Sequence, residues 1–339
     1  MTLRIAGMLL VLASGTVGAQ AAPVLINGAG ATFPFPLYSK WFSEYQKIDP
    51  AVEINYQSVG SGAGIRQFLD RTVDFGASDA PMTAAQLAKS DVPVLHVPTA
   101  LGAVVVTYNL AAVTGRLALD GATLADIYLG KISYWDDARI QALNPKLSFP
   151  HTAIIVAHRS DGSGTTAIFA DYLAKISPEW KDNVGVGTAL KWPTGLGGKG
   201  NEGVTGLVKQ TPGDIGYVEL VYAQQNKLPV AALKNAAGKL IEPSVASVTA
   251  AAASSLKDIP ADYRVSITNS PGASAYPISG FTYLLVYSKM PKGKGAPIVK
   301  FLGWALGAGQ KTAEPLDYAP LPAALAKKVL VSVGTIALE

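Results

Sequence analysis

Three segments of the sequence share one local plan, and this repetition constrains the fold more than any other feature. In each segment a β-strand pattern runs into a glycine-rich turn that carries a hydroxyl residue, and a helical pattern follows. The three turns are "NGAGATF" (residues 27–33), "GSGAG" (residues 60–64) and "RSDGSGTT" (residues 159–166). Strands that alternate with helices predict an α/β protein with mainly parallel sheets.

The rest of the chain continues this alternation. Further strands are predicted at residues 94–97, 104–108, 214–218 and 281–287, and further helices at residues 204–209, 220–225, 250–255 and 297–306. Two capped helix starts are also predicted, one from Thr83 with Gln86 and one from Thr123 with Asp126.

The first 21 residues have the pattern of a secretory signal peptide. A short basic start with Arg4 precedes an apolar run over residues 5–13, and Ala19-Gln20-Ala21 fits the A-x-A cleavage pattern. The apolar run is about half the roughly twenty residues that a membrane-spanning helix needs. We therefore predict export with cleavage near Ala21, which leaves a chain long enough for two domains.

Composition excludes several classes of protein. Cysteine is absent, which excludes thiolate metal sites, thiol nucleophiles and disulfides. The net charge of +4 is small and not clustered, so a nucleic-acid partner is not expected. The three histidines and the carboxylates lack metal-ligand spacing, and we expect neither a metal nor a cofactor.

Two motifs resemble motifs of enzymes, but neither has the spacing or the flanking sequence that the enzyme motif requires. Ser163 lies in "DGSGT", which lacks the G-x-S-x-G spacing of a nucleophile elbow. The segment "GLGGKG" (residues 195–200) fits the dinucleotide pattern G-x-G-x-x-G, but it follows "KWPT" instead of an apolar strand. We interpret it as a loop beside the mouth of a cleft. A secreted phosphatase remains the alternative from the enzyme class.

The three turns together favour the binding of an oxyanion. Ligands of open α/β sheets bind beyond the carboxyl ends of the strands, and helix N-termini attract anions there. Four hydroxyl residues in the turns can donate hydrogen bonds: Thr32, Ser61, Ser163 and Thr165. Arg159 adds a planar fork of donors suited to a tetrahedral oxyanion, and Asp161 can brace that fork.

Asp79, in "DFGASDAP" (residues 74–81), narrows the choice of oxyanion. A carboxylate among anion-binding elements repels a ligand that has no proton to donate to it. Phosphate and arsenate carry such a proton near neutral pH and sulfate does not, so the site is expected to reject sulfate. Phosphate and arsenate are not separated by this argument.

Five motifs in order closely resemble the periplasmic phosphate-binding proteins of ABC phosphate importers, the PstS-like family. They are "GAGATFPFPLYSKW", "DFGASDAP", "LGKISYWDD", "HRSDGSGTT" and "KWPTGLGGKGNEGV", and the resemblance runs over about residues 26–318. It implies a two-lobed periplasmic-binding-protein fold (type II-like), with a mixed, mainly parallel sheet in each lobe and a hinge between them. The ligand contacts that it implies are Thr32, Phe33, Ser61, Asp79, Arg159, Ser163, Gly164 and Thr165, with Asp161 supporting the arginine.

The resemblance also implies organisation and partners. Lobe I is expected to hold residues 23–106 and 280–339, and lobe II residues 107–279. We expect the protein to be a monomer. We expect it to capture inorganic phosphate in the periplasm and to deliver it to a membrane permease. A binding protein for another protonated oxyanion, such as arsenate, is the alternative.

Overall fold

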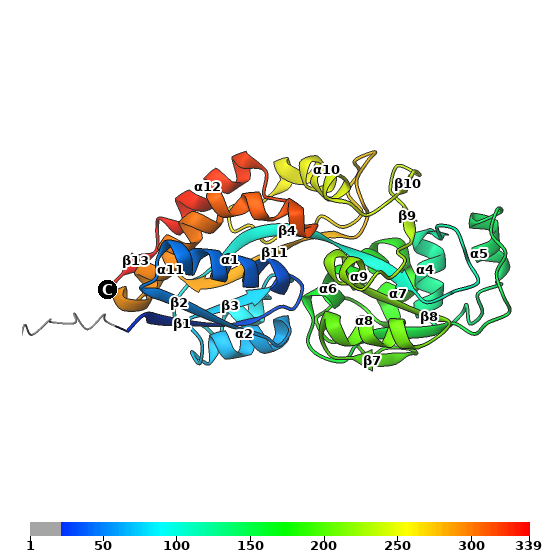
Figure 1. Ribbon diagram of the computed structural model, residues 1–339, viewed down its shortest axis with the longest axis horizontal. Coiled ribbons are helices and arrows are strands. Elements are labelled where there is room, and N and C mark those ends of the chain that lie inside the picture. The colour runs from blue at the N-terminus through cyan, green and yellow to red at the C-terminus, as the bar shows by residue number, and fades with distance from the viewer. Residues whose placement is uncertain (1–21) are drawn as a thin grey trace, which may run out of the picture.

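The computed structural model describes residues 22–339 as two lobes that lie side by side (Figure 1). The predicted signal peptide falls on residues 1–21, outside the described residues, and it stays a prediction. Across residues 22–339, no helix combines the length and the apolar character that crossing a bilayer requires.

One eight-stranded sheet runs through both lobes in the order β2–β1–β3–β11–β4–β8–β6–β7. Its strands are β1 (Val24–Gly30), β2 (Val52–Ser58), β3 (Phe75–Ser78), β4 (Val94–Tyr108), β6 (Ile155–Arg159), β7 (Leu196–Gly198), β8 (Asp214–Glu219) and β11 (Ser279–Tyr287). The pairs β1–β2, β1–β3, β6–β7 and β6–β8 are parallel, whereas β3–β11, β11–β4 and β4–β8 are antiparallel. This mixed sheet with flanking helices confirms the predicted fold class.

The lobes divide the elements between them (Figure 1). Lobe I contains β1–β3, β11 and the first part of β4, with α1 (Phe35–Ile48), α2 (Ser61–Leu69), α3 (Ala84–Leu87), α11 (Lys292–Ala305) and α12 (Ala323–Val333). Lobe II contains the second part of β4 and β6–β8, with α4 (Gly121–Tyr128), α5 (Ala138–Leu143), α6 (Gly164–Ile176), α7 (Pro178–Asn183), α8 (Gly200–Gln210) and α9 (Leu220–Gln225). Two small sheets complete the fold, formed by β5 (Ala118–Leu119), β9 (Ala232–Lys234) and β10 (Leu240–Ile241), and by β12 (Lys289–Met290) and β13 (Ala337–Leu338).

β4 connects the lobes because it changes its partner along its length. Up to Ala103 it pairs with β11, and from Val104 it pairs with β8. The sequence predicted two strands here, whereas the structure has one. Pro98 lies in the gap between the two predictions, and the pairing with β11 shifts at this point, leaving Thr99 without a paired residue. A bulge of this kind lets a proline remain within a strand.

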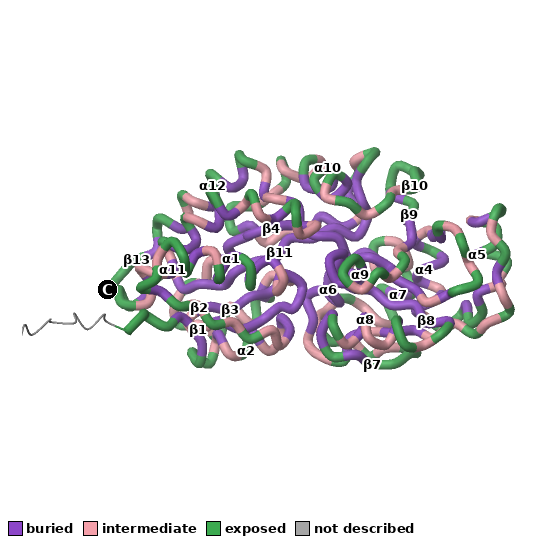
Figure 2. Tube along the Cα trace, viewed as in Figure 1, coloured by how far each residue is buried: buried purple, intermediate pink, exposed green. Residues whose placement is uncertain are grey.

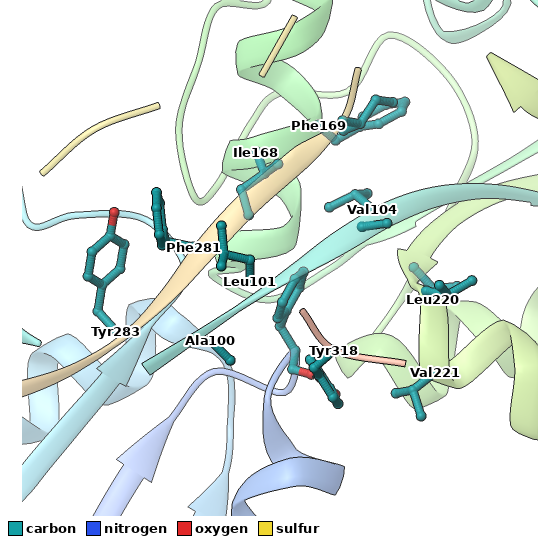
Figure 3. Packing of buried hydrophobic residues seen from close by; sticks show 14 of the residues in the cluster. Ala100, Leu101, Val104, Ile168, Phe169, Leu220, Val221, Phe281, Tyr283 and Tyr318 are labelled. Atoms are coloured by element: carbon teal, nitrogen blue, oxygen red, sulfur yellow. The ribbon is translucent and has the colours of Figure 1, made fainter. Parts of the chain in front are cut away.

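The apolar core is continuous between the lobes. α1 shows how the sequence builds it, because Leu37, Tyr38, Trp41, Phe42 and Tyr45 recur on one face and are all buried. Buried chain follows the sheet through the middle of the molecule, and exposed chain lies on the outer helices (Figure 2). Side chains of both lobes, including Ile168 of α6 and Phe281 of β11, gather around the middle of β4 (Figure 3).

Two local predictions are corrected by the structure. α4 is capped by Asp120, whose Oδ1 accepts from Thr123 N at 2.8 Å, so the predicted cap from Thr123 and Asp126 is wrong. Asp120 is the N-cap because it immediately precedes the first turn, where its carboxylate can accept from the free N–H groups. The segment at residues 195–200 is not a plain loop, since it contains β7 and begins α8.

The chain between α10 (Val245–Ser255) and β11 contacts both lobes. Tyr263 O accepts from Tyr283 OH of β11 at 3.0 Å, and Arg264 Nη1 donates to Met82 O at 3.3 Å. A few residues later, Thr268 O accepts from Lys175 Nζ of α6 at 3.2 Å. Besides β4 and β11, this segment is therefore a further link between the lobes.

Candidate anion-binding site

The predicted site residues meet where the carboxyl ends of four strands face one another between the lobes. In lobe I, Thr32 and Phe33 follow β1, Ser61 begins α2 and Asp79 follows β3. In lobe II, Arg159 ends β6, Ser163 precedes α6, and Gly164 and Thr165 begin it. Each of these residues is buried. The exposed fraction is at most 3% for Thr32, Phe33, Ser61, Asp79, Arg159, Ser163 and Thr165.

The lobes touch directly at this place. Gly164 N of lobe II donates to Ser61 Oγ of lobe I at 3.0 Å, and Gly62 N donates to Gly162 O at 2.8 Å. A Cβ atom on Gly164 would lie 2.5 Å from Asp79 Oδ2, which is too close for any side chain. The glycines of the turns therefore allow the two backbones to close on each other.

Arg159 provides the positive charge of the lobe II half. Its Nε and Nη2 donate to Asp161 Oδ1 and Oδ2 at 2.7 and 2.6 Å, and Nη1 lies 3.5 Å from Thr165 Oγ1. Burial acts to raise the pKa of Asp161, but its bonds with Arg159 hold that pKa below the usual value. The bidentate pair fixes the guanidinium plane and neutralises much of its charge. Attraction of an anion therefore depends also on donors around the arginine.

Helix α6 provides further donors. Ser163 is the N-cap, since its Oγ accepts from Thr166 N at 3.0 Å. The N–H groups of Gly164 and Thr165 belong to the first turn, which has no carbonyl partner inside the helix. The positive end of the helix dipole therefore points into the space between the lobes.

The turn after β1 contributes two backbone amides to the site. Tyr222 OH donates to Thr32 O and Tyr318 OH donates to Phe33 O, each at 2.6 Å. These two hydroxyls hold the carbonyls on one side of the turn. Within the described chain, residues 22–339, the N–H groups of Thr32 and Phe33 donate to no protein atom. Two buried and free amides are unusual, and they indicate a ligand that accepts hydrogen bonds.

Asp79 is the buried acceptor of the site. Thr282 Oγ1 donates to its Oδ1 at 2.8 Å, and Ser61 Oγ lies 3.4 Å from its Oδ2. Burial raises the pKa of Asp79 to about 7, and the hydrogen bonds from Thr282 and Ser61 and the positive charge of Arg159 oppose that rise only in part. Oδ2 is the oxygen left to accept a proton from a ligand.

Two residues of the site were missed by sequence reasoning. Thr282 lies 203 positions from Asp79, and its hydroxyl reaches the carboxylate because β11 pairs antiparallel with β3, with Tyr283 opposite Ser78. Asn201, the second residue of α8, contacts Thr32 and Thr165. A signal for Asn201 did exist, because β7, Gly200 and α8 repeat the strand, glycine turn and helix plan a fourth time.

The chemistry of the site is therefore that of many donors and one acceptor. In the part of the chain that the structure describes, no cluster of three or more His, Asp and Glu side chains is placed to hold a metal ion. The donors come from both lobes, and the cation among them, Arg159, is already paired with Asp161. Such a site suits a small tetrahedral anion with at least one proton.

A two-lobed fold with a buried site at its cleft defines a solute-binding protein, and comparison with known proteins agrees. Residues 17–308 match the PBP superfamily domain. The phosphate-binding protein PstS of Xylella fastidiosa is 46% identical over 316 residues, which cover 91% of this chain and 85% of that protein. PstS of Methanocaldococcus jannaschii is 42% identical, with 94% of this chain and 87% of that protein covered. The chain belongs to the PstS-like family of phosphate-binding proteins.

A solved structure extends the comparison to three dimensions. A high-affinity periplasmic phosphate-binding protein, PfluDING, bound with phosphate at pH 8.5, is 25% identical with a TM-score of 0.71. The match covers 90% of this chain and 93% of that one.

Proposed function

We propose that this protein captures inorganic phosphate between its two lobes and delivers it to the permease of an ABC phosphate importer. The observation that carries the proposal is the convergence of buried donors from both lobes on one buried acceptor, Asp79. Membership of the PstS-like family and the phosphate bound in PfluDING support it.

The proposed ligands are the predicted residues. Thr32, Phe33 and Ser61 donate from lobe I, and Asp79 accepts the proton of the phosphate. Arg159, Ser163, Gly164 and Thr165 donate from lobe II, while Asp161 orients the arginine. A dehydrated anion is costly to bury, and roughly ten charge-assisted hydrogen bonds of about 1.5–3 kcal/mol each can offset that cost.

Closure follows from this arrangement. A ligand that is contacted by both lobes binds the closed form more tightly than the open one, and so it shifts the population toward closure. We propose that lobe I comprises residues 23–106 and 280–339 and lobe II residues 107–279, with the hinge in β4 and at the start of β11. The partner change of β4 after Ala103 supports a hinge close to this boundary.

The cellular setting is part of the same proposal. The protein works in the periplasm after the signal peptide is cleaved near Ala21, as a monomer, and its macromolecular partner is a membrane permease and not a nucleic acid. It is a binding protein and not an enzyme.

Equilibrium dialysis with radiolabelled phosphate tests the proposal. The chain of residues 22–339 is expected to bind one phosphate per molecule and to retain it when sulfate is present in large excess. Arsenate is expected to compete because it carries the same proton. Retention of no phosphate at about 1 mM, or displacement by an equal concentration of sulfate, would overturn the proposal.

A further inference from the structure

Asn201 lies between the two lobes and is fully buried. It is the second residue of α8, and its backbone and side chain both reach Thr32 of lobe I. It is not among the residues proposed above to contact phosphate. Any role in phosphate binding must therefore act through the hydrogen bonds that its side-chain amide forms with neighbouring residues.

The orientation of the Asn201 amide is fixed by a backbone group. Glu219 N donates to Asn201 Oδ1 at 2.9 Å, and an N–H can only donate. The oxygen of the amide must therefore face Glu219, and the NH₂ group must face the other way. There Nδ2 lies 2.7 Å from Thr32 Oγ1 and 3.2 Å from Thr165 Oγ1, so its two hydrogens have one hydroxyl each.

Each of these hydroxyls also accepts from a second group that can only donate. Asn201 N donates to Thr32 Oγ1 at 3.2 Å, and Arg159 Nη1 approaches Thr165 Oγ1 at 3.5 Å. A hydroxyl has two acceptor positions and one hydrogen. Because both acceptor positions are taken, Thr32 and Thr165 have only their hydrogens left for a ligand.

We propose that Asn201 is a positioning residue that makes the hydroxyls of Thr32 and Thr165 obligatory donors toward the bound anion. The inference rests on the proposed function and deepens it. A freely rotating hydroxyl can present either its hydrogen or a lone pair to an oxyanion. A hydroxyl held by Asn201 is preorganised to present its hydrogen, and the orientation cost of binding is reduced.

The same side chain also connects closure to orientation. Asn201 and Thr165 belong to lobe II, and Thr32 belongs to lobe I. The Asn201–Thr32 contact therefore forms only when the lobes meet. Thr32 becomes an obligatory donor in the closed form, where the anion is enclosed.

A set of double-mutant cycles measured by equilibrium dialysis tests this role. Asn201→Leu keeps the approximate size and removes the amide, and it should weaken phosphate binding about tenfold, the effect of one charge-assisted hydrogen bond. If Asn201 acts through the hydroxyls, its effect must shrink when a hydroxyl is absent. In the Thr32→Val and Thr165→Val backgrounds, Asn201→Leu should therefore weaken binding only about threefold.

A second variant guards against a folding defect in Asn201→Leu. Asn201→Asp keeps an acceptor for Glu219 N but offers the threonines an acceptor in place of a donor, so their hydrogens turn away from the anion. With its added negative charge, it should weaken phosphate binding more than Asn201→Leu does. Asn235→Leu is the control, because Asn235 is another buried asparagine of lobe II whose amide serves backbone groups remote from the site. It should lower the unfolding temperature and leave the phosphate affinity unchanged.

The results distinguish this inference from the proposed function. A wild-type protein that binds no phosphate contradicts both. Two other results contradict the role of Asn201 alone, provided that the wild-type protein binds phosphate. In the first, Asn201→Leu weakens phosphate binding by the same factor in the wild-type, Thr32→Val and Thr165→Val proteins. In the second, Asn201→Leu does not weaken phosphate binding at all.

Discussion

The two halves of the site each hold a carboxylate, and its surroundings differ: Asp79 is buried in lobe I, whereas Asp161 is only partly buried in lobe II. In lobe II, Asp161 is paired with Arg159 through two hydrogen bonds, and its pKa is held below the usual value. In lobe I, Asp79 receives hydrogen bonds from hydroxyl groups, and burial raises its pKa to about 7. One carboxylate balances a cation, and the other is ready to share a proton.

This difference assigns separate tasks to the lobes. The lobe II half presents an arginine whose geometry is fixed in advance, together with the N-terminus of α6, and it attracts any small oxyanion. The lobe I half adds the carboxylate that only a protonated oxyanion can satisfy. Affinity therefore depends more on lobe II and selectivity more on lobe I. Four variants or conditions test this division of tasks between the lobes.

Arg159→Ala should have the largest effect on phosphate affinity. It removes the guanidinium donors and leaves the partly buried carboxylate of Asp161 unpaired beside the anion. Calorimetric titration should show a loss of at least about 1.5–3 kcal/mol in the binding free energy of phosphate, the contribution of a charge-assisted hydrogen bond. The matched control is Arg139→Ala, because Arg139 forms an exposed ion pair with Asp137 and should contribute little. A loss below about 1.5 kcal/mol for Arg159→Ala would mean that the helix ends suffice.

A rise in pH should open the ligand-free protein through Asp79. The pKa of Asp79 is about 7 in the closed form and about 4 when exposed to water, so the closed form binds more protons between these values. Its advantage is full below about pH 4 and is lost as the pH rises through 7, a change of about 2–4 kcal/mol. Small-angle scattering should show the radius of gyration increasing over this range.

The Asp79→Asn variant is the control for this titration. Its radius of gyration should not follow pH in the same window, because Asp161 has a lowered pKa and stays ionised there. Equal pH dependence in both proteins would assign the opening to another group.

Gly162→Val should weaken phosphate binding by preventing full closure. A Cβ atom on Gly162 would lie 3.0 Å from Gly62 Cα, and the larger valine adds overlap that costs about 1–3 kcal/mol. The unfolding temperature without ligand should change little, since the open lobes do not press on each other here. Gly206→Val is the control, because no atom lies within 4 Å of a Cβ built there. Unchanged affinity in Gly162→Val would contradict the closed arrangement of the two turns.

Much of the fold and the site could be predicted because the signals are local. A strand, a glycine turn and a helix follow each other within about twenty residues, and each such unit places its own donors at the end of its strand. The turns at residues 27–33, 60–64 and 159–166 were found in this way.

The missed features depend on contacts between distant segments. The single strand β4 was predicted as two because Pro98 breaks the local pattern, and only the bulge against β11 accommodates it. Thr282 reaches Asp79 through the long-range antiparallel pairing of β11 with β3. Asn201 was missed for another reason, since the glycine-rich segment before it was judged by its upstream residues and not by the helix that it begins.

Asp79 is proposed to accept a proton from the bound anion, and a calorimetric comparison of two proteins tests this role. Wild-type protein and Asp79→Asn are titrated with phosphate and with sulfate at neutral pH. We predict that the wild type strongly prefers phosphate, and that Asp79→Asn reduces this preference at least tenfold, about 1.4 kcal/mol, because the amide no longer repels an unprotonated anion. The same preference for phosphate over sulfate in both proteins would contradict the claim.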